Sequence, residues 1–110
     1  MIKRFVFGKA FDTEAVKDKP EACKEKIPYF ENAETSSFSL EMDSSDIVYG
    51  LGENVRGINK RGFIYESFCT DQPEHNENKS SLYAAHNFFI VSGNKKNFGA
   101  FFDTPGKVTF

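Results

Sequence analysis

The sequence lacks tryptophan, has only two cysteines and carries no excess charge of either sign. Fourteen Lys and Arg residues against sixteen Asp and Glu residues give a formal net charge of −2. Such a chain has no field that would gather nucleic acid or an anionic membrane, so neither partner is expected. Cys23 and Cys69 lie far apart, and neither has a Cys or His nearby at zinc-ligand spacing. Both are predicted to be free, reduced thiols, and no metal site is expected.

Long apolar runs are also missing. A basic pair near the N-terminus precedes only the short apolar run 5–7, which is too short for the core of a signal peptide. No stretch approaches the roughly 20 apolar residues of a membrane span, so the prediction is a cytoplasmic protein. A chain of 110 residues is expected to hold at most one domain. Because Phe110 ends an alternating apolar segment, we expect the chain to belong to a longer protein.

The sequence is rich in β-forming aromatic residues, with thirteen phenylalanines and four tyrosines. Residues 37–43 alternate polar and apolar, which predicts a half-buried strand with Phe38, Leu40 and Met42 on one face. Turn-forming residues between 92 and 97 predict a hairpin, and the Gly and Asn there suit a left-handed backbone. Further strands are predicted at 47–48, 63–68, 87–91, 98–102 and 107–110. The fold class is therefore predicted to be all-β, as a β-sandwich or part of one.

Two short motifs each admit two interpretations. Residues 49–55, YGLGENV, contain the first two glycines of a dinucleotide fingerprint, but the third glycine is missing and no periodic helix follows. The alternative is a turn in which the glycines adopt positive φ. Lys60 and Arg61 could form an anion site or belong to a solvated turn.

The longest polar stretch is the loop 68–83, FCTDQPEHNENKSSLY. A connection of this length inside a compact domain is usually either disordered or part of a binding site. Asp71, Glu74, His75 and His86 offer atoms that a metal could use, yet their spacing matches no known pattern. Asp71 and Glu74 are unsuited to be a glycosidase carboxylate pair, because both would be solvated and ionised together on one loop.

Five motifs occur in an order and spacing that resemble a known family. The run 49–103 is similar to the N-terminal β-sandwich domain of family 31 glycoside hydrolases, which include α-glucosidases and α-xylosidases. This chain departs from the family at Asn87-Phe88, where Pro-Phe is frequent. The matching motifs are 49–53 (YGLGE), 59–62 (NKRG), 70–73 (TDQP), 81–83 (SLY) and 98–103 (FGAFFD).

The resemblance implies a galactose mutarotase-like β-sandwich that normally precedes a (β/α)8 catalytic barrel. Residues 1–110 would then be the N-terminal domain, truncated at its C-terminal side, of a retaining α-glucosidase acting on α-linked gluco-oligosaccharides. Both catalytic carboxylates would lie in the barrel, so this chain is expected to contain no catalytic residue. Asp71 matches a family aspartate that contacts the sugar hydroxyls of the substrate.

No cofactor is implied by this resemblance. The expected partners are a carbohydrate substrate and the enzyme's own barrel, and the fragment is expected to self-associate through the exposed strand 107–110. The alternative is a non-catalytic carbohydrate-binding or structural β-domain.

Overall fold

The computed structural model describes residues 1–7, 21–32 and 34–110. These residues form seven short strands in three antiparallel sheets and contain no helix, which confirms the all-β prediction. No helix that could cross a membrane is therefore found among them. The chain divides into two compact units, Met1–Glu41 and Met42–Phe110.

The first unit contains one two-stranded sheet. Strand β1 (Tyr29–Glu31) pairs with β2 (Ser36–Phe38), and Tyr29 lies opposite Phe38. The Phe7 ring stacks on Tyr29, with 4.2 Å between the ring centroids.

The strand predicted over 37–43 is too long, because β2 ends at Phe38. Continuing this antiparallel register would place Ser39 opposite Pro28. Proline has no backbone N–H and cannot donate to the ladder, which explains why pairing stops there. Leu40 consequently stays 43% exposed instead of joining a buried face.

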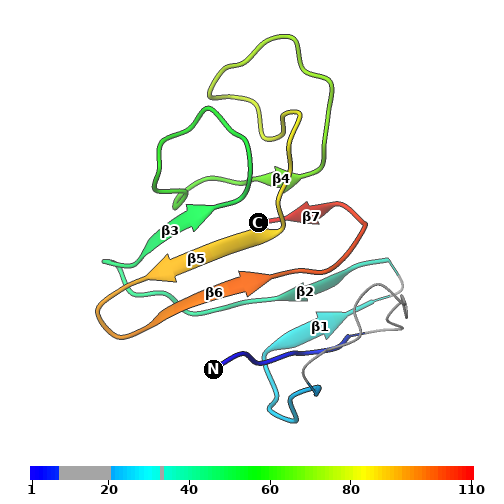
Figure 1. Cartoon of the computed structure of the whole chain (residues 1–110), viewed down its shortest axis with the longest axis vertical. Coiled ribbons are helices and arrows are strands. Elements are labelled where there is room, and N and C mark those ends of the chain that lie inside the picture. The colour runs from blue at the N-terminus through cyan, green and yellow to red at the C-terminus, as the bar shows by residue number, and fades with distance from the viewer. Residues whose placement is uncertain (8–20, 33) are drawn as a thin grey trace. The chain divides into compact units, whose positions relative to one another are not determined.

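The second unit is built on a three-stranded antiparallel sheet of order β3-β5-β6 (Figure 1). Its strands are β3 (Ile47–Gly50), β5 (Phe88–Ser92) and β6 (Asn97–Phe101). The predicted hairpin is confirmed, since β5 and β6 pair directly with Ser92 opposite Asn97. A separate two-stranded sheet joins β4 (Glu66–Ser67) to β7 (Val108–Thr109).

One face of the three-stranded sheet forms the aromatic core of this unit. The Phe89 ring lies 6.0 Å from Phe102 and 5.8 Å from Phe110, and Val91 beside it is only 1% exposed. Alternation along β5 places Phe88 and Ile90 on the other face, where they are 41% and 42% exposed. The core of this unit therefore lies against one face of the sheet, as the alternation of buried and exposed residues along β5 requires.

The turn between β5 and β6 forms without the left-handed backbone that its Gly and Asn predicted. No residue from 92 to 97 has positive φ. Gly93 is required for space instead, because a Cβ there would overlap the carboxylate of Asp46. Asp46 is 2% exposed, and its Oδ2 accepts from the Asp43 N–H at 2.9 Å. The glycine therefore lets the turn pack against a buried acid.

Strand β7 is paired along one edge. Phe110 and Tyr65 exchange two backbone hydrogen bonds of 2.9 Å, which extend the β4–β7 ladder. Self-association through this segment would have to use the other edge of β7. It stays a prediction.

An ion pair beside this ladder makes its stability depend on pH. Lys107 Nζ lies 2.5 Å from Glu66 Oε1, and this hydrogen bond is the main reason that the pKa of Glu66 lies below its ordinary value of 4.5. A lowered pKa means that the pair stabilises the fold above about pH 4.5 and that this contribution disappears as the pH falls through the folded-state pKa. Because the Lys107 side chain is exposed and that of Glu66 is partly exposed, salt should weaken the effect.

We therefore expect Glu66→Gln to lower the unfolding midpoint at pH 7 and to have a smaller effect near pH 3. Thermal unfolding of both proteins across this pH range measures the difference, and Glu74→Gln is the control on an exposed carboxylate. An equal shift at both pH values would contradict the prediction.

Candidate functional site

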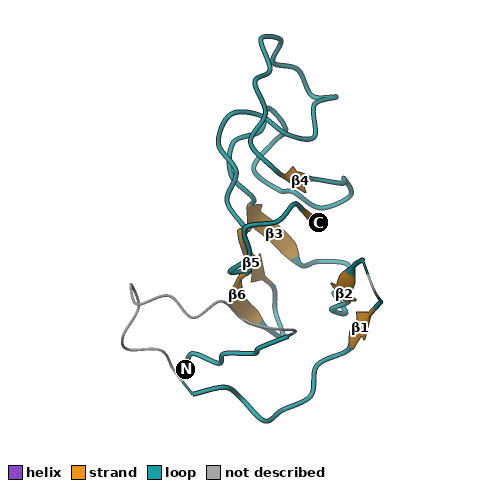
Figure 2. Cartoon of the chain, turned by 90° about the vertical axis from the view of Figure 1, so that its right-hand side faces the viewer, coloured by secondary structure: helices purple, strands orange, loops and turns teal. Residues whose placement is uncertain are grey.

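The chain between β3 and β5 is almost entirely loop, interrupted only by the two residues of β4 (Figure 2). In Figure 1 its two long segments, 51–65 and 68–83, extend from the same end of the unit. We call the segment 68–83 the Asp71 loop.

The first segment begins with three consecutive residues of positive φ. Gly50, Leu51 and Gly52 have φ of 108°, 67° and 77°. This turn brings the chain against residues 84–88: the Leu51 N–H donates to Phe88 O at 2.9 Å. The turn interpretation of YGLGENV is confirmed, and no helix follows the glycines as a dinucleotide site would need.

Lys60 and Arg61 fit neither interpretation offered by the sequence, because both hold the chain's own oxygens. Lys60 Nζ donates to Asn54 Oδ1 at 2.5 Å, Gly57 O at 2.8 Å and Arg56 O at 3.1 Å. The pKa of Lys60 lies below its usual value, mainly because the ammonium group is partly buried and to a smaller extent because the positive charge of Arg56 is nearby. All three ammonium donors are used in these bonds. Lys60 therefore shapes a turn and is not available to bind an anion.

Arg61 has the corresponding role at a different turn. Its Nη1 donates to the carbonyls of Asp43, Ser44 and Asp46 at 2.6, 3.0 and 2.9 Å. By binding three carbonyls of residues 43–46, the guanidinium fixes the turn before β3.

The Asp71 loop is closed at its base by hydrogen bonds. The Thr70 N–H donates to Leu82 O at 2.8 Å, and the Ser81 hydroxyl donates to the Phe68 carbonyl. Leu82 is 3% exposed and anchors the returning arm in the core. The structure therefore shows an ordered base for this loop, and not the disordered connection that the sequence left open.

The outer part of the loop has two further contacts. The His75 and Tyr83 rings lie 5.4 Å apart at a tilt of 59°, which joins the two arms. Arg56 Nε donates to Glu77 O at 2.8 Å and so connects the loop to the preceding segment. Local hydrogen bonds around Asn76 close a turn at 76–79.

Asp71 lies on the outgoing arm of this loop and is exposed. Its carboxylate makes no hydrogen bond or ion pair with any residue in the ranges 1–7, 21–32 and 34–110. An ionised carboxylate accepts hydrogen bonds only, and it can take two from neighbouring hydroxyls. Within the same ranges, no three His, Cys, Asp or Glu side chains gather as a metal site requires, so His75 and His86 do not join Asp71 in such a group.

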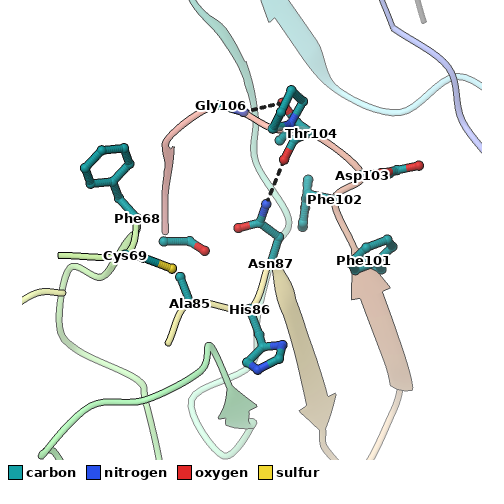
Figure 3. A pocket seen from close by; sticks show the side chains of 12 residues that line it. Phe68, Cys69, Ala85, His86, Asn87, Phe101, Phe102, Asp103, Thr104 and Gly106 are labelled. Carbon is teal, nitrogen blue, oxygen red and sulfur yellow. Dashed lines mark hydrogen bonds between the residues drawn. The ribbon is translucent and has the colours of Figure 1, made fainter. Parts of the chain in front are cut away.

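An open hollow of about 400 Å³ lies at the base of the loop, lined by residues 67–69, 85–87 and 101–106 (Figure 3). Asn87 extends into its wall, where Nδ2 donates to Thr104 O at 3.3 Å. Asn87 Oδ1 is buried and has no hydrogen-bond partner among the described residues. Phe68 and Phe101 beside it are 53% and 68% exposed. The hollow thus combines a buried acceptor with exposed aromatic rings.

Residues 6–110 match the model of the glycosyl hydrolase 31 N-terminal galactose mutarotase-like domain. The chain belongs to this family. It is also 33% identical over 88 residues to "Alpha-glucosidase 2" from Bacillus thermoamyloliquefaciens, an alignment that covers 79% of this chain and 11% of that protein. The alignment with this chain therefore spans only about a tenth of the length of this curated relative.

Family membership confirms the resemblance found in the sequence. Cys23 and Cys69 form no disulfide, as predicted.

The residues that sequence reasoning missed are those that hold the loops of this mutarotase-like domain, above all Arg56. Nothing in its neighbourhood, Val55-Arg56-Gly57, distinguishes it from an ordinary surface arginine.

Proposed function

We propose that this chain is the N-terminal domain of a retaining α-glucosidase that acts on α-linked gluco-oligosaccharides, and that its Asp71 loop contributes a substrate contact. Family membership is the observation that carries the α-glucosidase assignment. The exposed and unpaired carboxylate of Asp71, on a loop held by side chains, supports the substrate contact.

The chemistry would be divided between two parts of the protein. A downstream barrel would supply the nucleophile and the acid/base, which work as a carboxyl pair about 5–5.5 Å apart in retaining enzymes. Asp71 would accept hydrogen bonds from hydroxyls of the sugar, each charge-assisted bond contributing roughly 1.5–3 kcal/mol. This domain would thus bind and orient the substrate without taking part in bond cleavage.

Activity should follow the barrel and not this domain. The complete protein that contains this chain is expected to hydrolyse 4-nitrophenyl α-glucoside and to release the α-anomer first, as observed by NMR. Residues 1–110 alone are expected to show no turnover, because both catalytic carboxylates would lie in the barrel, and Asp71 and Glu74 on one exposed loop would be ionised together.

Turnover that persists through repurification of the 110-residue chain would contradict this prediction. A complete protein that cleaves only β-glucosides would contradict the proposed specificity. Inactivity of the chain carries weight only if its far-UV circular dichroism shows a folded β-protein.

The alternative is a carbohydrate-binding domain that works without a catalytic barrel, and the hollow is the observation that favours it. The exposed Phe68 and Phe101 rings that line the hollow could stack on a sugar. Binding of maltose to residues 1–110 that is lost in Phe101→Ala would support this alternative. Absence of binding would leave the α-glucosidase domain as the better account.

A further inference from the structure

Arg56 occupies the junction between the Asp71 loop and the rest of the second unit. Its guanidinium donates through two different nitrogens, from Nε to Glu77 O at 2.8 Å and from Nη1 to Ile64 O at 2.9 Å. Glu77 lies on the returning side of the loop, and Ile64 precedes β4. A single planar group therefore bridges two backbone segments that are distant in sequence.

Two aromatic rings also contact the guanidinium. Its Cζ lies 4.6 Å from the centroid of Phe63 and 5.1 Å from that of Tyr65, within the range of cation–π attraction. Tyr65 is 3% exposed and belongs to the core through its pairing with Phe110. Because the rings orient the plane, both hydrogen bonds have a fixed direction, which a flexible ammonium group could not reproduce.

These contacts determine where the outer part of the loop can lie. The base of the loop is closed at Thr70 and Leu82, and Arg56 adds a hold at Glu77 on the far side of Asp71. Without the contact at Glu77, residues 71–79 would be attached only through the base, the Ser80–Glu66 backbone hydrogen bond and the His75–Tyr83 ring contact, and they could pivot while the core stayed folded. The position of the Asp71 carboxylate would then vary from one molecule to the next.

We propose that Arg56 is a positioning residue that fixes the reach of Asp71 toward the substrate sugar. Its effect on the substrate rests on the proposed function of Asp71, whereas its effect on the loop does not. Misplacement of a binding group by about 1 Å can cost up to roughly a hundredfold in rate, so the expected loss is about tenfold in kcat/KM.

The test uses the complete protein and compares Arg56→Ala, Arg56→Lys and Arg61→Ala. Arg56→Ala should speed amide hydrogen exchange in residues 71–79 several-fold and lower kcat/KM on maltose about tenfold. Arg56→Lys should give an intermediate result, because lysine keeps the charge but lacks the planar fork from which two separate nitrogens reach the two carbonyls. Arg61→Ala is the matched control: it also removes an arginine that binds carbonyls, but at residues 43–46, and should leave exchange in the Asp71 loop unchanged.

A double variant separates positioning from general damage to the fold. If Arg56 acts through Asp71, then adding Arg56→Ala to Asp71→Ala should lower kcat/KM little further, while hydrogen exchange in the loop should still increase. Full additivity of the two kinetic losses would overturn the proposal. Unchanged exchange in both Arg56 variants would also overturn it.

The kinetic outcomes distinguish this proposal from the function on which it rests. If Asp71→Ala lowers kcat/KM and Arg56→Ala does not, the positioning role fails and the substrate contact stands. If Asp71→Ala has wild-type kinetics, the substrate contact fails and the positioning role fails with it. If Arg56→Ala does not fold, the Arg56→Lys variant provides the same comparison.

Discussion

Replacing Gly52 with alanine is expected to lower the free energy of unfolding by about 2–5 kcal/mol, which is a large part of the stability of a typical domain. Gly52 has φ of 77°, and a Cβ there would lie 2.7 Å from His86 N and 2.9 Å from Ala84 O. Both are backbone atoms, so no side chain can turn aside to make room. The added methyl group must therefore push the turn away from residues 84–86 or strain it in place.

Two other glycines serve as matched controls for urea unfolding of the same chain. Gly62 has φ of 88°, but no atom lies within 4 Å of where a Cβ would be. Gly62→Ala should therefore show only the cost of placing alanine at positive φ, about 1–2 kcal/mol. Gly57 has neither a positive φ nor a close neighbour, and Gly57→Ala should be neutral or stabilise by about 0.4–1 kcal/mol. Equal effects at all three positions would show that close packing against residues 84–86 is not what Gly52 provides.

Local patterns predicted the strands well where neighbouring segments determine the pairing. The hairpin of β5 and β6 follows from two aromatic-rich runs joined by a short turn, and both strands were expected. The length expected for the strand at 37–43 was wrong, because it depends on Pro28, which lies ten residues before Phe38 and just ahead of the opposite strand. Alternation identifies a segment that can form a strand, but the partner decides where the ladder ends.

The candidate site was predictable only in part, for a similar reason. A long polar loop suggested a binding function, and resemblance to the family assigned a role to Asp71. The contacts that give the loop its position could not be anticipated: the carbonyls bound by Arg56 lie 8 and 21 residues from it. Contacts of this kind leave no periodicity or motif in a single sequence.

The largest functional effect is expected from Asp71→Ala in the complete enzyme, with a drop of roughly ten- to a hundredfold in kcat/KM on maltose. The variant would remove one charge-assisted contact of roughly 1.5–3 kcal/mol with the sugar and leave its hydroxyls to water. If the contact is equally strong in the ground and transition states, KM rises and kcat holds. If it orients the sugar for attack, kcat falls as well. Stability should hardly change, because no described residue hydrogen bonds to the Asp71 carboxylate.

Glu74→Ala is the control for this experiment, because Glu74 is an exposed carboxylate three residues further along the same loop. It removes the same charge at nearly the same place, so any general effect of loop charge on substrate approach appears in both variants. Asp71→Asn adds a second comparison, since an amide keeps the size and one acceptor but loses the charge. A graded loss through Asn to Ala at Asp71, with Glu74→Ala near wild type, would place the carboxylate in contact with the sugar. Near-wild-type kinetics for all three would mean that Asp71 only begins a surface turn with Gln72 and Pro73.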